Sequence, residues 1–152
     1  MNNMENDAPQ DLRTRTSDFA LKIIRLYTSL PKTTEAQVIG KQVLRSGTSI
    51  GAHYREGHRA KSDADIVNKF VNALQELDET DYWLELLTKG GIVPALKIEP
   101  LRKETNELLA IFTTIVTKIK KRMIKKQEMF WMATFILLPS SPSMENYQCQ
   151  KI

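Results

Sequence analysis

The sequence predicts an all-α protein that folds as an antiparallel, up-and-down four-helix bundle. Proline ends helix interiors, and the prolines leave three long uninterrupted stretches, at residues 10–30, 32–93 and 101–138. Within these stretches apolar residues recur at alternating steps of three and four, which is the repeat of a buried helix face. No segment before residue 129 shows the alternation of a strand. Helices of similar length with short connections pack as an antiparallel bundle.

The punctuation of the chain sets the helix bounds. We expect helices at about 11–30, 34–59, 62–89 and 100–126. The stretch 32–93 is too long for one ordinary helix, and we expect its break where Gly57 permits a left-handed stop and Ser62 can cap the next helix. Lys89-Gly90-Gly91 then ends the third helix.

Each predicted helix carries a buried face that can be read from the repeat. The first helix places four apolar residues on it: Phe19, Ile23, Leu26 and Leu30. The third helix repeats the spacing at Ile66, Phe70, Ala73, Leu77, Leu84 and Leu87, with Thr80 in the gap. The fourth uses Leu101, Leu108, Phe112, Ile115 and Ile119, with Thr105 in the gap.

Length and composition favour one ordinary globular domain. The chain has 152 residues, 41% of them hydrophobic and 26% charged, and a net charge of +4. A single cysteine, Cys149, excludes a disulfide framework and a thiolate-rich zinc site. The polar N-terminus is unlike a secretory signal, and no apolar run reaches the ~20 residues that cross a bilayer. We therefore expect a cytoplasmic protein.

The second predicted helix is unusually rich in glycine. Gly40, Gly47, Gly51 and Gly57 lie within it or at its end, and each interior glycine costs roughly 1 kcal/mol relative to alanine. Gly47-x-x-x-Gly51 places two small residues on one side, which predicts close approach of another backbone. That backbone can belong to the same bundle, to a second subunit or to a ligand.

The same helix places cations on one side. At about 100° per residue, four basic residues fall within a sector of about 80°, opposite Val43, Ile50 and Tyr54. They are Lys41, Arg45, Arg55 and Arg59. Three interpretations of this stripe remain open: a solvated face, a surface that pairs with the acidic third helix, or a surface that binds the phosphates of a nucleic acid. The third is considered because cations supply most of the affinity for nucleic acid.

Charge is also uneven between helices. The third predicted helix has seven acidic and two basic residues, whereas the fourth has eight basic and two acidic. Such a contrast is a plausible device for fixing helix pairing within or between subunits. Six cations crowd nine positions near the end of the fourth helix: Lys118, Lys120, Lys121, Arg122, Lys125 and Lys126. The helix dipole accounts for one or two of them, and the excess predicts contact with RNA, DNA or another polyanion.

The sequence lacks the usual signatures of catalysis. His53 and His58 point to different sides of a helix and belong to no Glu-x-x-His pair, so a di-metal bundle is not supported. There is no glycine-rich phosphate loop, nucleophile elbow or Cys-x-x-Cys. We expect no enzyme activity, no metal and no cofactor.

The ends of the chain are expected to differ from the bundle. We predict a disordered arm at 1–10, the bundle at 11–128, and an extension at 129–152 that is apolar to residue 138 and disordered from Pro139. The apolar segment can extend the fourth helix into an assembly interface, dock on the bundle, bind a partner or be an irrelevant extension.

Two long motifs carry a family resemblance. Residues 44–57, LRSGTSIGAHYREG, and residues 76–87, ELDETDYWLELL, resemble the bacterial "four helix bundle protein" family, which includes proteins encoded in intervening sequences of the large-subunit ribosomal RNA gene. The resemblance covers about residues 12–122, and His53 stands where members commonly have asparagine. It implies a ring-shaped pentamer, and a similar bundle is the accessory protein of diversity-generating retroelements, which engages nucleic acid and a reverse transcriptase.

The resemblance also singles out motif positions for testing. It marks Arg45, Arg55 and Glu56, with Glu56 expected to be a structural partner of Arg59 or Arg45. Structural roles are expected for Gly47, Ser49, Glu56 and Gly57. Our first hypothesis is a non-enzymatic homo-oligomer that binds the RNA or DNA backbone through its basic faces. The alternative is a structural adaptor that contacts another protein through the acidic third helix and the apolar tail.

Overall fold

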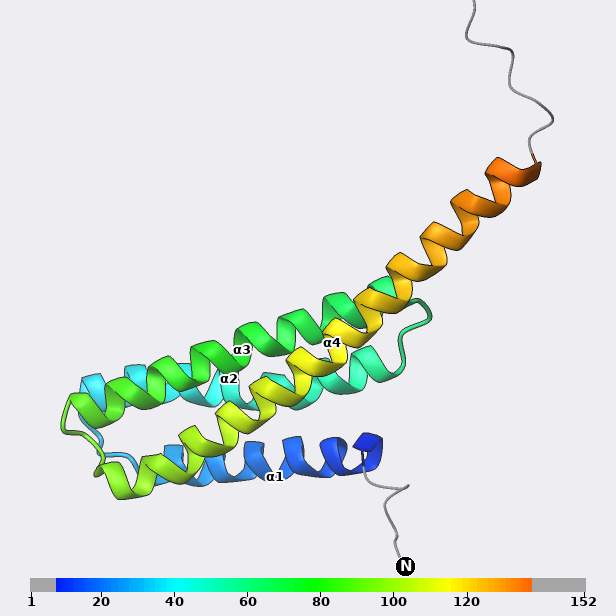
Figure 1. The fold of residues 1–152 in the computed structure, drawn as a ribbon. Helices are drawn as coiled ribbons and strands as arrows, with labels where there is room; N and C mark the ends of the chain where they lie inside the picture. The colour runs from blue at the N-terminus through cyan, green and yellow to red at the C-terminus, as the bar shows by residue number, and fades with distance from the viewer. Residues whose placement is uncertain (1–7, 138–152) are drawn as a thin grey trace, which may run out of the picture. The chain divides into compact units, whose positions relative to one another are not determined.

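The computed structural model describes the backbone of residues 8–137 and the side chains of residues 12–136. Over this range it contains four helices and no strand: α1 (Ala8–Ser29), α2 (Thr34–His58), α3 (Asp63–Lys89) and α4 (Ala95–Leu137) (Figure 1). The predicted all-α class and up-and-down bundle are confirmed. Of the arm predicted at 1–10 and the extension predicted at 129–152, residues 1–7 and 138–152 lie outside the described residues, and α1 already begins at Ala8. The chain divides into two units, Met1–Lys120 and Lys121–Ile152.

The caps explain where α2 and α3 begin and end. Ser62 accepts a hydrogen bond from the backbone N–H of Asp65 at 3.1 Å, so the predicted cap of α3 is confirmed. The predicted left-handed stop at Gly57 is wrong, because Gly57 lies buried inside α2 and the helix is capped by Arg59 in a right-handed conformation. The left-handed turn falls after α3, at Gly91, whose φ is 68°.

α4 begins earlier and ends later than predicted. It starts at Ala95 rather than near Pro100, and it continues to Leu137 rather than ending near residue 126. Pro100 lies in the second turn, where its missing N–H removes a single bond near the helix start. Ile98 and Leu101 on either side are 1% and 7% exposed, so packing holds this turn in helical form.

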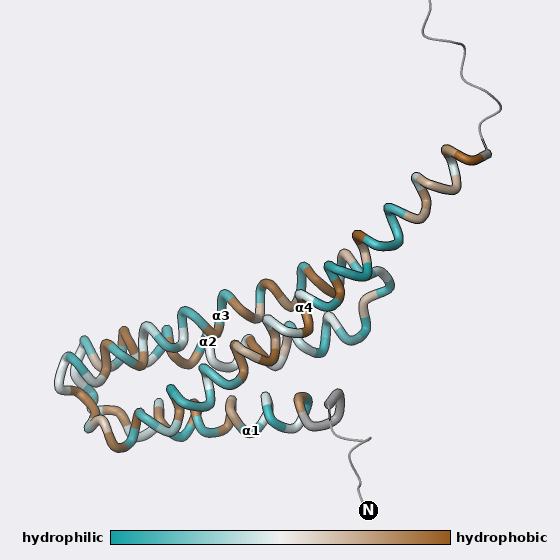
Figure 2. Tube along the Cα trace, viewed as in Figure 1, coloured by the Kyte–Doolittle hydropathy of each residue, from teal (hydrophilic) through white to brown (hydrophobic). Residues whose placement is uncertain are grey.

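The predicted buried faces form the core of the first unit, with hydrophobic and hydrophilic residues alternating along each helix (Figure 2). Phe19, Ile23, Leu77, Leu84 and Phe112 are at most 1% exposed, and Thr80 and Thr105 are buried in the predicted gaps. Ile66, Ile115 and Ile119 are only half-buried, whereas their neighbours Val67 and Val116 are buried.

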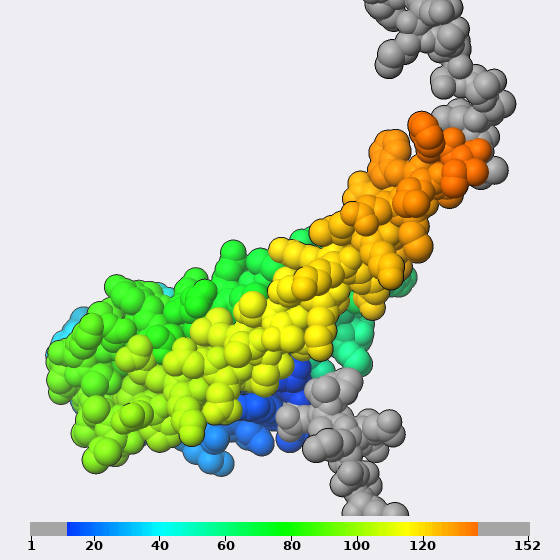
Figure 3. All heavy atoms as spheres, in the orientation of Figure 1, coloured from blue at the N-terminus to red at the C-terminus, as the bar shows by residue number. Residues whose placement is uncertain are grey.

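An aromatic cluster joins three of the helices. The ring centroids of Phe70 and Phe112 are 5.5 Å apart in an edge-on arrangement, and Tyr54 stacks on Phe70 at 5.9 Å. Side chains of α3 and α4 fill the space between their ribbons on the face shown in Figure 3. These contacts tie α2, α3 and α4 together at the level of Tyr54.

The glycines of α2 allow close packing within the bundle. A Cβ added at Gly47 would lie 2.8 Å from Cγ1 of Ile23 in α1, and one added at Gly57 would lie 2.5 Å from Cε1 of Phe70 in α3. Of the three predicted explanations for the close approach, packing within the bundle is the one these distances support.

Ion pairs between helices use the acidic residues of α3 and α4. Arg102 of α4 holds Asp81 of α3 in a two-pronged pair at 2.7 and 2.8 Å. Arg15 of α1 holds Glu104 of α4 at 2.6 and 2.9 Å. The charge contrast between helices therefore contributes to pairing inside one chain.

Candidate anion-binding site

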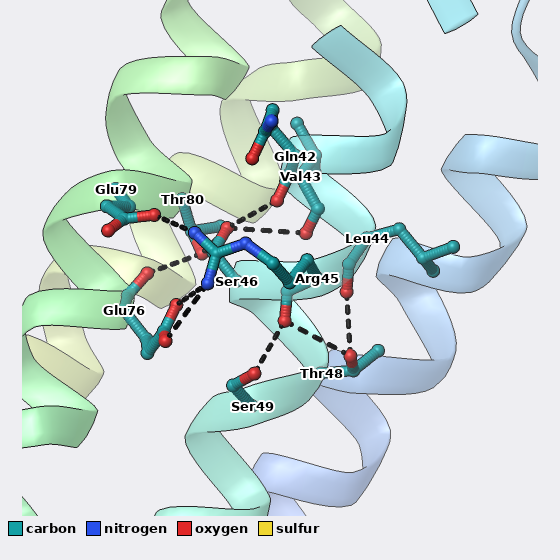
Figure 4. A network of polar contacts seen from close by, with 10 residues as sticks. All are labelled: Gln42, Val43, Leu44, Arg45, Ser46, Thr48, Ser49, Glu76, Glu79 and Thr80. Carbon is teal, nitrogen blue, oxygen red and sulfur yellow. Dashed lines mark hydrogen bonds and ion pairs between the residues drawn. The ribbon is translucent and has the colours of Figure 1, made fainter. Parts of the chain in front are cut away.

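The four cations of the predicted stripe on α2 lie in different surroundings. Arg45 reaches α3, where it pairs with Glu76 at 3.3 Å and with Glu79 (Figure 4). Beside it, Thr80 and the buried Ser46 bring their hydroxyl oxygens to 2.9 Å (Figure 4). Lys41 is exposed. The predicted pairing with the acidic helix thus accounts for Arg45, whose charge is balanced within the chain.

Arg55 turns the other way, toward α1. Its guanidinium donates to the carbonyl oxygen of Gly51 at 2.8 Å, to Oγ of Ser17 at 2.7 Å and to the carbonyl oxygen of Arg13 at 3.4 Å. All three acceptors are neutral, and no ion pair to Arg55 occurs among the described side chains. A half-buried guanidinium is therefore held in place, and no carboxylate among residues 12–136 pairs with it.

A cavity of about 690 Å³ opens beside Arg55. It lies between the first half of α1 and the end of α2 and is lined by Arg13, Thr14, Ser17, Tyr54, Arg55, His58 and Arg59. We call this cavity the arginine pocket. It gathers three guanidinium groups, an imidazole and two aliphatic hydroxyls, and none of these lining residues is acidic. Such a concentration of like charge is costly unless an anion is present.

Tyr54 forms the apolar wall of the arginine pocket. Tyr54 as a residue is 4% exposed, and its ring stacks on His58 with the two centroids 6.0 Å apart. Burial raises the pKa of the Tyr54 phenol, and the neighbouring charges of Arg13 and Arg55 partly oppose that rise. Both guanidinium groups therefore act on the same point in the pocket.

The donors of the arginine pocket suit a phosphoryl group. Guanidinium groups bind phosphate oxygens through parallel N–H bonds, and hydroxyl groups complete the shell. The volume exceeds that of a single phosphate and falls within the range of small-ligand sites. It leaves room for the sugar or base next to the phosphate, which can rest against the exposed ring of His58.

Sequence reasoning found part of this pocket. It named Arg55 and Arg59 but missed Arg13, Ser17 and His58. Arg13 and Ser17 lie four residues apart on one face of α1, which was the available signal. What the sequence could not supply was the rotation of α1 that turns this face toward Arg55.

The remaining motif residues have structural contacts. Ser49 donates to the carbonyl oxygen of Arg45 at 2.7 Å. Glu56 pairs with Lys69 of α3 at 2.6 Å. The prediction that Glu56 pairs with Arg59 or Arg45 is therefore wrong. The Lys69 ammonium lowers the pKa of Glu56. Nδ1 of His53 is 3.9 Å from the Glu56 carboxylate.

The basic run of α4 divides between the two units. Lys118 and Lys120 belong to the first unit, and the second unit contains Lys121, Arg122, Lys125 and Lys126. All six side chains are exposed. None of these six residues is among the described residues that line the arginine pocket.

The described residues contain neither a candidate metal site nor a candidate membrane-spanning helix. Residues 12–136 contain no group of three histidine, cysteine or acidic side chains placed to hold a metal ion. No helix between residues 8 and 137 has the length and apolar character that crossing a membrane requires.

The fold and the pocket together define a four-helix bundle with a cavity lined by arginine side chains. Residues 10–114 match the family model described as 23S rRNA-intervening sequence protein. The chain belongs to this family, and the resemblance seen in the sequence is confirmed.

A solved structure supports the same assignment. The chain is similar to a protein of unknown function from the S23 ribosomal protein family of Bacteroides thetaiotaomicron VPI-5482. The two are 37% identical, with a TM-score of 0.68, over 72% of this chain and 97% of that one. No curated protein matches the sequence.

Proposed function

We propose that this protein is a non-catalytic homo-oligomer that binds the phosphate backbone of RNA or DNA through the arginine pocket. The observation that carries the proposal is the charge of Arg55, which forms no ion pair among the described side chains and is gathered with Arg13 and Arg59 around one cavity. Nucleic-acid affinity arises mainly from such cations, which displace counterions from phosphates. Lys41, Lys118 and Lys120, which are exposed in the same unit, are the proposed outer contacts.

Assembly of several copies is part of this proposal. The family resemblance implies a pentamer, in which each copy would contribute one pocket. Exposed apolar side chains support an interface, since Leu21 and Ile24 are 49% and 41% exposed one turn apart on α1 and Val38 of α2 is 57% exposed. A ring would multiply weak phosphate contacts into useful affinity.

The adaptor alternative has less support. Of its two proposed contact surfaces, the acidic third helix and the apolar tail, the first is engaged within the chain: the carboxylates of Glu76, Glu79, Asp81 and Glu85 all pair with cations of the same chain. Acidic groups engaged in this way are less available to a partner.

The test compares two double variants that lose the same charge. Arg13→Gln with Arg59→Gln removes the exposed cations of the pocket, and Arg25→Gln with Lys32→Gln removes two exposed cations elsewhere in the unit. Affinity for a fluorescent single-stranded RNA of mixed sequence is measured by anisotropy over a range of salt concentrations. Arg55 is left intact because it also holds α1 against α2.

The pocket variant should bind RNA more weakly, and its affinity should fall less steeply as the salt concentration rises. Each phosphate contact contributes about 0.7 to the salt slope for single strands, so losing two should lower the slope by roughly 1.4. The control variant should keep the original slope. Equal losses in both variants would reject the pocket as the site, and no salt-dependent binding by the unmodified protein would reject nucleic acid as the ligand.

A further inference from the structure

The second unit combines two kinds of surface on one short helix. Four cations stand at its start, and an apolar segment rich in aromatic residues follows, as the change from hydrophilic to hydrophobic colouring along the end of α4 shows (Figure 2). The apolar side chains are unusually exposed: Phe130 69%, Trp131 65%, Met132 64%, Phe135 81% and Ile136 77%. Glu128 is the one acidic residue among residues 121–136.

The cations and the aromatic rings lie on opposite sides of the helix in projection, and the cations precede the rings along the chain. At about 100° per residue, Lys121, Arg122, Lys125 and Lys126 occupy a sector of about 140°. Phe130, Trp131 and Phe135 fall within the opposite sector of similar width, together with Met123 and Ile124, whereas Met129, Met132 and Ile136 fall in the sector of the cations. The segment after residue 128 is therefore apolar on both sides. A cluster of cations followed by exposed aromatic and aliphatic side chains is typical of segments that bind an anionic membrane surface.

We propose that residues 121–137 bind the surface of an anionic lipid bilayer. The cations would lie at the lipid headgroups, and Phe130, Trp131 and Phe135 would enter the boundary between headgroups and acyl chains, where aromatic rings are favoured. The apolar part, residues 129–137, rises about 14 Å at 1.5 Å per residue, which is half the hydrocarbon thickness. It therefore lies in the interface and does not cross it.

The charges and the rings together favour lipid over the other occupants. RNA would take up the cations but leave five large apolar side chains in water. A parallel second copy would bring another set of four cations close to the first, and an antiparallel one would set its cations beside the apolar segment. An anionic bilayer satisfies both surfaces at once. This inference does not depend on the arginine pocket.

The experiment measures binding of the full chain to vesicles. Phosphatidylcholine vesicles with and without phosphatidylglycerol are sedimented with the protein, and tryptophan emission is recorded. Trp83→Phe leaves Trp131 as the sole tryptophan reporter, and Trp131→Phe is its control. We expect binding only to the phosphatidylglycerol vesicles, with a blue shift that is kept in Trp83→Phe and lost in Trp131→Phe.

Two further variants separate charge from insertion. Each cation contributes about fivefold to partitioning onto an anionic surface, so Lys121→Gln with Lys125→Gln should weaken binding about 25-fold. Arg25→Gln with Lys32→Gln loses the same charge and should bind normally, as should Arg13→Gln with Arg59→Gln. Phe130→Ser with Phe135→Ser should abolish the blue shift.

Three results would overturn the proposal. One is equal binding to both kinds of vesicle, or to neither. Another is vesicle binding that RNA fully displaces and that leaves the Trp131 emission unshifted. This result would make the segment a polyanion contact. The third is a smaller oligomer for Phe130→Ser with Phe135→Ser while vesicle binding is unchanged, which would identify a second copy as the occupant.

Discussion

Replacing Gly47 with alanine tests whether α1 and α2 pack as closely as described. The new Cβ would lie 2.8, 3.1 and 3.3 Å from Cγ1, Cγ2 and Cδ1 of Ile23, which is completely buried. A β-branched side chain in a helix has little rotamer freedom, so Ile23 cannot turn away. Relief of the clash would require the two helices to move apart.

The expected magnitude follows from two opposing effects. Alanine gains roughly 1 kcal/mol over glycine inside a helix, whereas overpacking a core costs about 1–3 kcal/mol. Gly47→Ala should therefore destabilise the protein by about 1 kcal/mol, the difference between a mid-range overpacking cost and the helix gain. In an Ile23→Ala background the clashing atoms are gone, and the same change should stabilise by about 1 kcal/mol. The sign of the effect reverses.

The assay is urea unfolding followed by circular dichroism at fixed protein concentration, applied to the four members of the cycle. Gly51→Ala is a milder comparison, because its new Cβ would lie 2.9 Å from the guanidinium of Arg55 and 3.3 Å from Oγ1 of Thr16, and it should cost less than Gly47→Ala. Stabilisation by Gly47→Ala in the presence of Ile23 would refute the close packing of α1 and α2.

Three further predictions concern single contacts, each measured by urea unfolding. Arg15 lowers the pKa of Glu104 below its unfolded value, so this pair stabilises fully above about pH 4.5 and the effect is lost as pH falls through the folded pKa. Glu104→Gln should cost on the order of 1 kcal/mol at pH 7 and almost nothing in acid, and a constant cost would contradict the ion pair. Thr80→Val combined with Ser46→Ala should destabilise by less than the sum of the single changes, each about 1 kcal/mol, because the two hydroxyls are partners. Ser62→Ala should cost about 1 kcal/mol through loss of the helix cap, and an unchanged midpoint would show that the cap is not formed.

The fold could be predicted from the sequence because periodicity reports burial directly. Leu77, Leu84 and Phe112 lie on the predicted buried faces. Thr80 and Thr105, which fill the gaps in the apolar repeat, are buried with them. Rules about single residues were less reliable. Gly57 serves packing against Phe70 rather than a turn, since a glycine can be selected for its missing side chain as well as for its backbone freedom.

The site could be predicted only in part because helix rotation is a tertiary property. Arg45 and Arg55 lie on the same side of α2 in projection, yet they sit at the two edges of that sector. One edge faces the carboxylates of α3 and the other faces α1. No pattern within α2 could show that Arg13, from another helix, would complete the pocket.

Family membership leaves the ligand to be determined by chemistry. The family description, 23S rRNA-intervening sequence protein, names a genetic setting and no activity, and the similar solved structure is of a protein of unknown function. A shared fold does not carry a shared function. The proposal therefore rests on the arginine pocket itself.

The most direct test of that proposal observes the pocket as RNA is added. The chain has two histidines, of which His58 lines the arginine pocket and His53 lies beside Glu56. Histidine-labelled protein is titrated with a short RNA oligonucleotide, and the two imidazole signals are followed by NMR. Binding in the pocket predicts a saturable shift of His58 with little change at His53. Binding that leaves His58 unmoved would contradict the proposal.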